Sequence, residues 1–416
     1  MEGRHRARTA PGERSPSFLD ALRTRAFGVV FAAEAQSIAG DQLARVALSV
    51  VVFHETGSAA ATGLTFAATF LPAIVGGPVL GRLGDRLPRR RVMVVADLVR
   101  ALLFAAMTLP GVPTPGLVTL LVLAVFVSPV FGAAAVSYLA AQLEPEVFRA
   151  GTGLRMLSSQ GSQVVGFAVG GALVAALGAR SVLGLDALTF VVSALLIGAG
   201  APREPGPPAP PDPSEASPAR AGLWRDRRVR RLVLLSALAA FFVAPEGLAV
   251  PFAAELGGST TAAGLLLASI PLGSVAGIYV LVRRVPPAKR ATVAGVMAVG
   301  AGVPLLASGL PHSLPAAAAL WFVSGAGAAY QVEVLTRLVH MVPDAVRSRA
   351  LGVVNAILLG AQGLGVAAFG AVADGITARA AVALAGGIGA VAAVCLVWWP
   401  DRLAPSMASA GALRTE

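Results

Sequence analysis

The 416-residue chain has little charge, one lysine and one cysteine. Only 13% of its residues are charged and 56% are hydrophobic, and the mean hydropathy is +0.75. A soluble protein of this composition could not cover its surface with polar groups. The scarcity of charge therefore excludes an ordinary soluble fold and predicts an all-α protein of the lipid bilayer.

The scarcity of reactive side chains excludes several classes of chemistry. A single cysteine, Cys395, rules out a disulfide framework, and the four histidines show no metal-ligand spacing. The only lysine, Lys289, lies in PPAKRA, and the chain has no GxxxxGK[ST] segment, which excludes an ATP-driven pump within it. No nucleophile is paired with a base. We therefore expect neither an enzyme nor a metal or cofactor site.

Apolar segments long enough to cross a bilayer occur twelve times, since a helix needs about 20 residues to span about 30 Å of hydrocarbon. We expect these spans near 27–52, 60–81, 92–110, 117–140, 149–176, 180–200, 231–254, 261–282, 291–310, 315–339, 349–373 and 377–399. A proline-rich segment separates six spans from six, and it ends in the basic amphipathic stretch GLWRDRRVRR. The predicted regions are a tail 1–26, a six-helix bundle 27–200, a linker 201–230, a six-helix bundle 231–400 and a tail 401–416.

The distribution of basic residues along the chain explains the net charge of +11. With twelve spans, the opposite side carries only Arg180 and Arg379, and Arg45 and Arg100 lie within spans. The other 29 of the 33 Lys and Arg lie in the tails, the linker, or the loops and span junctions on one side. The positive-inside rule then places both termini and the linker in the cytosol of a bacterial plasma membrane, and we expect no nucleic-acid partner.

The two halves resemble each other. A shift of 199 positions aligns Gly171 with Gly370 and Arg180 with Arg379, along with several further glycines and Gln163 with Gln362. A constant offset over the fifth and eleventh spans indicates two repeated six-helix bundles.

The first span carries its polar residues on one face. Glu34, Ser37, Asp41 and Arg45 follow one another at spacings of three, four and four residues. Such a face cannot point at lipid. Asp41 and Arg45 could form a self-neutralised ion pair, or the face could line a path whose carboxylates bind protons; the sequence leaves both open.

Further polar residues lie inside other predicted spans. Glu246 lies between Pro245 and Pro251, where we expect an interrupted helix beside protein or water. Intramembrane ionisable groups usually serve function, so cavity roles are favoured for Glu246 and Glu333. The predicted proton and substrate cavity consists of Glu34, Asp41, Arg45, Gln163, Glu246, Tyr330, Gln331, Glu333 and Gln362.

Asp97 and Arg100 lie one turn apart in the third span. We interpret them as a short charge pair that anchors this helix to its neighbours. Asp186, near the outer end of the sixth span, is expected to reach the interface.

The stretch GRLGDRLPRRR, residues 81–91, joins the second span to the third. It resembles the signature cytosolic loop of the major facilitator superfamily, in residues Gly81, Leu83, Gly84, Asp85, Arg86, Arg89 and Arg90. The resemblance implies that Asp85 latches the two bundles together beside the start of helix 11. A carboxylate at a helix N-terminus contributes about 0.3 to 1 kcal/mol, which a conformational cycle can overcome.

Four longer stretches resemble the drug and siderophore exporter branch of that superfamily, the macrolide and enterobactin efflux type of actinobacteria. They are SIAGDQLARVALSVVVFHETGS, DRLPRRRVMVVADLVRA, GARSVLGLDALTFVVSALL and RALGVVNAILLGAQGLGVAAFGAVAD. One departure is that Gly166 is followed by Phe167, where proton-coupled drug antiporters commonly carry Gly-Pro.

The resemblance implies a monomeric secondary transporter in contact with membrane lipids. It would export a small amphiphilic or cationic molecule by alternating access, driven by the proton gradient. Two alternatives stay open: a metabolite or lipid importer or exchanger of the same fold, and a non-transporting membrane scaffold or sensor.

Overall fold

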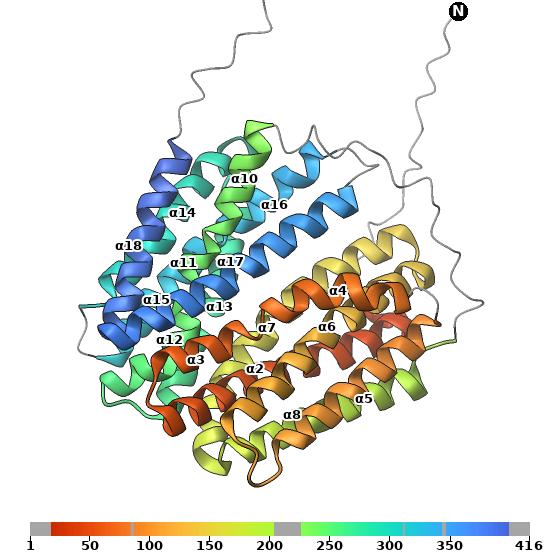
Figure 1. Cartoon of the computed structure of the whole chain (residues 1–416). Helices are drawn as coiled ribbons and strands as arrows, with labels where there is room; N and C mark the ends of the chain where they lie inside the picture. The colour runs from red at the N-terminus through yellow and green to blue at the C-terminus, as the bar shows by residue number, and fades with distance from the viewer. Residues whose placement is uncertain (1–17, 85–86, 204–225, 311–312, 343–346, 399–416) are drawn as a thin grey trace, which may run out of the picture.

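A computed structural model describes residues 18–84, 87–203, 226–310, 313–342 and 347–398. In these ranges the chain forms helices and no strand, arranged in two groups (Figure 1). The N-terminal half contains α1 (Phe18–Arg23), α2 (Arg25–Thr56), α3 (Ala59–Ala67), α4 (Leu71–Gly84), α5 (Arg89–Met107), α6 (Thr114–Gln142), α7 (Pro145–Leu177), α8 (Ala179–Leu195) and η1 (Leu196–Gly200).

The C-terminal half repeats this arrangement. It contains α10 (Arg227–Ala237), α11 (Ala239–Phe242), α12 (Ala244–Glu255), α13 (Thr260–Arg283), η3 (Pro287–Lys289), α14 (Arg290–Ala307), α15 (Leu314–Ala328), α16 (Tyr330–Met341), α17 (Arg347–Gly375) and α18 (Ala378–Val397). Consecutive pieces such as α3–α4 and α10–α12 follow one another as interrupted spans. The predicted fold of two six-helix halves is confirmed.

Within the described ranges, nine helices are long and apolar enough to cross a membrane. Three of the twelve predicted spans lie outside this group. The helices α2 and α5 carry charged side chains along their length, and α15–α16 is interrupted at Ala329. The charged spans must therefore turn their polar residues inward, toward protein.

The helix ends define two faces of the molecule. The hairpin face carries turns at Gly57, Gly111, Gly178 and Gly257, whose φ angles of 64° to 83° favour glycine. The linker face, at the other end, carries the first residues of α2 and α10 and the last residues of η1 and α18. At the hairpin face, Ser58, Ser259 and Thr377 each accept an N–H three residues ahead and begin α3, α13 and α18.

The two halves touch through paired glycines near the hairpin face. A Cβ atom at Gly171 of α7 would lie 2.9 Å from the Cα atom of Gly264 in α13. In the same way, a Cβ atom at Gly63 of α3 would lie 3.0 Å from the Cα atom of Gly370 in α17. Only glycine permits such close backbone crossings. Toward the linker face the helices of the two halves diverge (Figure 1).

A carboxylate joins the halves at the same face. Asp374, near the end of α17, accepts the hydroxyl of Ser58 at 2.7 Å and the backbone N–H groups of Ala59 and Ala60 at 2.7 and 3.1 Å. The first turn of α3 in one half is thereby capped by a side chain from the other half.

Several predicted boundaries differ from the structure. Helix α1 and the start of α2 lie within the predicted tail 1–26, and α10 begins inside the predicted linker 201–230. Asp226 explains the early start of α10, because its side chain accepts the N–H of Arg228 at 2.7 Å. The tail 401–416 and most of the linker lie outside the described residues.

Candidate functional site

The N-terminal half holds an ion pair between two helices. The Arg100 guanidinium of α5 donates to the Asp41 carboxylate of α2 at 2.6 Å, and its Cζ atom lies 4.0 Å from the centre of the Phe190 ring. The side chain of Arg100 is 7% exposed and that of Asp41 28% exposed. Because the pair is largely shielded from water, removal of either charge would leave the other without compensation and would lower the stability of the protein.

The predicted pairing of Asp97 with Arg100 is therefore wrong, because Arg100 binds Asp41. For Asp41 the sequence left two roles open, and the structure pairs it with Arg100 and not with Arg45. Asp97 instead accepts the hydroxyl of Ser193 in α8 at 2.5 Å. The physical reason is that α8 packs against both α2 and α5. Asp97 therefore reaches Ser193 of α8, and the long side chain of Arg100 reaches Asp41 of α2.

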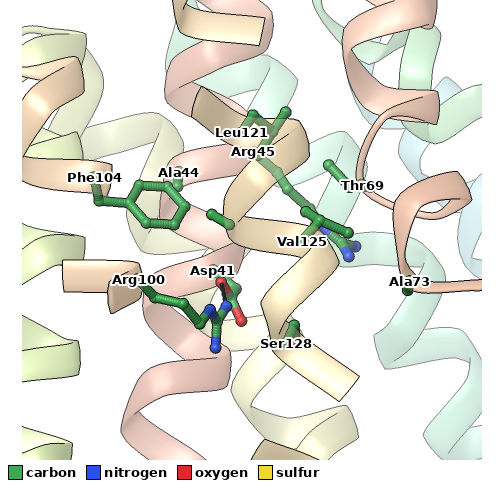
Figure 2. A pocket seen from close by; sticks show the side chains of 11 residues that line it. Asp41, Ala44, Arg45, Thr69, Ala73, Arg100, Phe104, Leu121, Val125 and Ser128 are labelled. Atoms are coloured by element: carbon green, nitrogen blue, oxygen red, sulfur yellow. Dashed lines mark hydrogen bonds and ion pairs between the residues drawn. The ribbon is translucent and has the colours of Figure 1, made fainter. Parts of the chain in front are cut away.

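A small cavity of about 80 Å³ adjoins this ion pair. Figure 2 shows Asp41, Arg45 and Arg100 around it, with Thr69 from the break between α3 and α4 and Ser128 from α6. The cavity has room for a few water molecules and presents several polar groups to them. It lies within the N-terminal half, whereas the cavity predicted from the sequence was to be shared by both halves.

Arg45 links this cavity to the other half. Its guanidinium carbon lies 5.6 and 5.3 Å from the ring centres of Phe66 and Phe70 in the α3–α4 segment. It interacts electrostatically with Asp41 on its own helix and with Glu246 of α12. Arg45 is thus a cation of one half that faces a carboxylate of the other.

Glu246 lies where its span is interrupted, as predicted. The span is divided into α10, α11 and α12, and Glu246 is half-buried in the first turn of α12, directly after Pro245. The next residue, Gly247, packs closely against Val366 of α17 and Gly63 of α3. Glu246 therefore sits at the junction of the two halves.

Glu34 forms a second ion pair that sequence analysis missed. Both of its carboxylate oxygens accept from Arg155 of α7, at 2.6 and 2.7 Å. The side chains are 20% and 12% exposed. Bidentate geometry and low exposure indicate a strong link between α2 and α7.

We expect Glu34→Gln to lower the free energy of unfolding by about 3 kcal/mol, because it leaves the Arg155 charge without a partner. Adding Arg155→Gln should restore part of that loss. Thermal unfolding of the purified single and double variants measures the coupling, with exposed Glu146→Gln as control. Additive losses in the double variant would contradict a direct pair.

The remaining predicted cavity residues do not converge on one point. Tyr330 is buried and donates to Leu235 O at 2.8 Å, and Gln331 donates to Ser236 O at 3.1 Å. Both therefore fasten α16 to α10 near its break. Glu333 pairs with Arg337 one turn later in α16, at 2.7 Å.

The two glutamines at equivalent repeat positions lie on α7 and α17. Gln163 donates to Gln160 on its own helix at 3.0 Å, and Gln362 is half-buried on α17. Their roles as cavity residues stay predictions.

The loop signature is described in part. Gly81 and Gly84 belong to the last turn of α4, whereas Asp85 and Arg86, with the expected latch, lie outside the described residues. Arg89 donates to Ser137 O of α6 at 3.1 Å, and Arg90 donates to carbonyls of Ile197 and Gly198 in η1. These arginines bind carbonyl groups of neighbouring helices, which ties α5 to the rest of its half.

The position of Asp186 differs most from the prediction made from the sequence. It was expected near the membrane interface, but it lies two turns inside α8 with 0% of its surface exposed. The sequence does show a carboxyl group within an apolar span, but its closeness to the end of that span suggested exposure at the membrane interface.

In the part of the chain that the structure describes, no group of three His, Cys, Asp or Glu residues could hold a metal ion.

Comparisons with known proteins identify the family to which the chain belongs. The model of the Major Facilitator Superfamily matches residues 30–330. The chain is 31% identical over 197 residues to the multidrug efflux pump Tap of Mycobacterium tuberculosis, an alignment that covers 44% of this chain and 47% of that protein. The chain thus spans about half the length of that relative. It is 27% identical over 357 residues to the multidrug efflux pump Tap of Mycolicibacterium fortuitum, covering 81% of this chain and 86% of that protein.

Solved structures share the fold. A POT family transporter in complex with a thioalcohol-conjugated peptide has a TM-score of 0.71 at 12% identity, over 90% of this chain and 96% of that chain. A D-xylose–proton symporter has a TM-score of 0.67 at 16% identity, over 90% and 96%. A bacterial homologue of the human lysosomal transporter Spinster, in an inward-facing and occupied conformation, has a TM-score of 0.67 at 16% identity, over 93% and 95%.

Proposed function

Because this chain belongs to the Major Facilitator Superfamily, we propose that it is a secondary active transporter that exports a small amphiphilic or cationic molecule by alternating access. The proton gradient supplies the driving force, and the chain acts as a monomer without a cofactor, covalent chemistry or a nucleic-acid partner. Export and the substrate class are supported by the two mycobacterial relatives, both named multidrug efflux pumps.

The observation that carries the proposal is the pair of opposite charges on either side of the junction. Arg45 belongs to the N-terminal half and Glu246 to the C-terminal half, and each contributes to the electrostatic environment of the other. A pivot of one half against the other changes the distance between these charges. Protonation of Glu246 removes its attraction to Arg45, so that proton binding and the position of the halves become coupled.

The proposed orientation places the linker face in the cytosol. Basic residues are concentrated there, and the hairpin face carries only Arg180 and Arg379 within its turns. In the described conformation the halves meet at the hairpin face and diverge toward the linker face (Figure 1). This arrangement corresponds to a conformation closed toward the outside of the cell.

We expect Glu246→Gln to lose proton-driven accumulation of substrate while substrate exchange down its gradient persists. Glutamine keeps the shape of the side chain but can neither attract Arg45 as an anion nor release a proton. The measurement is uptake into everted vesicles of cationic dyes, with and without an imposed pH gradient.

The matched control is Glu146→Gln, an exposed carboxylate on α7 whose loss should leave accumulation unchanged. Equal pH dependence in the wild-type protein and Glu246→Gln would contradict the coupling role of Glu246. Dye movement that ignores the gradient in the wild-type protein would favour an exchanger, and absence of any movement would favour a scaffold or sensor.

A further inference from the structure

Asp186 places a carboxyl group deep within the N-terminal half. The residue is 0% exposed, and its helix α8 packs against α2 and α5. A Cβ atom at Gly40 of α2 would overlap Asp186 Oδ1 and would lie 2.6 Å from Thr189 Oγ1. The glycine before Asp41 thus leaves the space that the carboxyl group occupies.

The contacts around Asp186 are compatible with a proton on its carboxyl group. Thr189 Oγ1 lies 2.8 Å from the backbone oxygen of Asp186 and 3.1 Å from its Oδ1 atom. A hydroxyl has one hydrogen to donate, and the backbone oxygen can only accept. When the hydroxyl donates to the backbone, the second contact is a hydrogen bond only if the carboxyl group donates it.

The second carboxylate oxygen supports the same reading. Asp186 Oδ2 is buried and has no hydrogen-bond partner in the described part of the protein. A charged oxygen in that position would lose its solvation without compensation, whereas the carbonyl oxygen of a neutral carboxylic acid loses much less.

The neighbouring carboxyl group of Asp97 differs. Its Oδ2 atom accepts the hydroxyl of Ser193 at 2.5 Å, a length typical of a hydroxyl bound to a charged carboxylate. The Ser193 hydroxyl has no other acceptor within the described ranges, so its hydrogen is available to Asp97. The other oxygen of Asp97, Oδ1, is buried without a hydrogen-bond partner in the described part of the protein, as Oδ2 of Asp186 is, so the two carboxyl groups differ in the bond from Ser193.

The charged groups near Asp186 also favour its neutral form. Asp41 of α2 and Arg100 of α5 interact with it electrostatically, and Asp97 lies one turn from Arg100 on α5. Arg100 is already bound to Asp41 at 2.6 Å, so an ionised Asp186 would add a further negative charge near one guanidinium. The titratable groups of α7, the third helix against α8, lie near its other end, where Arg155 is bound to Glu34.

We propose that Asp186 is a proton-binding residue of this transporter and that it holds its proton in the described conformation. The proposal rests on the proposed transport function and adds a group to it. The proton passes from the Asp186 carboxyl group to the Asp41 carboxylate, so that one carboxylate is gained as another is lost. Arg100 then pairs with Asp186 instead of Asp41, and the net charge of the buried cluster does not change.

Asp41 connects this exchange to water. It is partly exposed and lines the cavity of about 80 Å³, whereas Asp186 does not (Figure 2). A proton received by Asp41 can leave through water in that cavity. The pair therefore separates proton storage, on Asp186, from proton exchange with solvent, on Asp41.

Infrared spectroscopy of the purified protein tests the proton directly and without substrate. At neutral pH we expect a carbonyl band of a buried, protonated carboxylic acid that is absent from Asp186→Asn. Thr189→Val should shift this band without removing it, because it deletes the oxygen that accepts the proton's hydrogen bond. Glu146→Gln, an exposed control, should retain the wild-type band. A wild-type spectrum without a band that Asp186→Asn removes would overturn the proposal.

Transport assays separate this proposal from the function on which it rests. If wild-type vesicles show proton-driven transport, Asp186→Asn should lose its dependence on pH, and an unchanged pH profile would overturn the role of Asp186 alone. If wild-type vesicles show no proton-driven transport, the proposed function fails, while the infrared band still decides whether Asp186 binds a proton.

Discussion

Replacing Gly171 by leucine is expected to abolish transport while the protein still folds into its two halves. A Cβ atom at Gly171 would lie 2.7 Å from Thr260 O and 2.9 Å from Gly264 Cα, both backbone atoms of α13 that cannot rotate away. The halves must therefore separate at the hairpin face. A penalty of about 3 kcal/mol would lower the relative population of the closed conformation more than about a hundredfold.

Two measurements check this result. Dye transport should fall to background, and amide hydrogen exchange at the first turn of α3 should become faster, since Asp374 caps that turn only while the halves are closed. Gly161→Ala on the same helix is the control, because a Cβ atom there meets nothing within 4 Å. Normal transport by Gly171→Leu would show that the hairpin face need not close.

Removing the Arg100 charge is expected to have the largest effect on stability. Arg100→Met keeps the apolar length of the side chain above Phe190 but leaves Asp41 without its partner and Asp97 without a nearby cation. Loss of one member of a buried ion pair costs about 3 to 5 kcal/mol. Reduced yield and a lower unfolding temperature should follow.

A second substitution tests whether the loss of stability comes from the ion pair itself. Asp41→Asn in the Arg100→Met background should restore a large part of the lost stability, because both charges of the pair are then absent. Thermal unfolding of the two single variants and the double variant gives the coupling energy. Losses that simply add would mean that Arg100 stabilises the half through its stacking on Phe190 instead.

The sequence was sufficient to predict the helices but not the way they face each other. Length and apolar content predict the spans, and Pro245 predicts the interruption before Glu246, because these effects act within one segment. The ion pairs depend on the rotation and depth of packed helices, which no single segment specifies. Asp97 and Arg100 lie one turn apart on the same helix, so the sequence predicted that they bind each other. In the structure each of them binds a residue of a different helix.

The same limit explains Arg155 and Asp186. Arg155 lies in a stretch that reads as the charged cytosolic end of a helix, and its partner Glu34 is more than a hundred positions away in the sequence. Asp186 stands near the start of an apolar span, and only the packing of α2 and α5 against α8 shows that it is buried. The charged residues were found from the sequence, while their partners required the structure.

The cap that Asp374 places on α3 determines how readily the outer side can open. When the halves part, water can hydrate the freed carboxylate and the exposed amide groups of Ala59 and Ala60, so little solvation is lost on either side. The contact therefore joins two surfaces that water can reach, and it is not part of a buried interface. Outward opening should therefore be limited mainly by separation of the glycine crossings, and it should respond only weakly to replacement of Asp374 by asparagine.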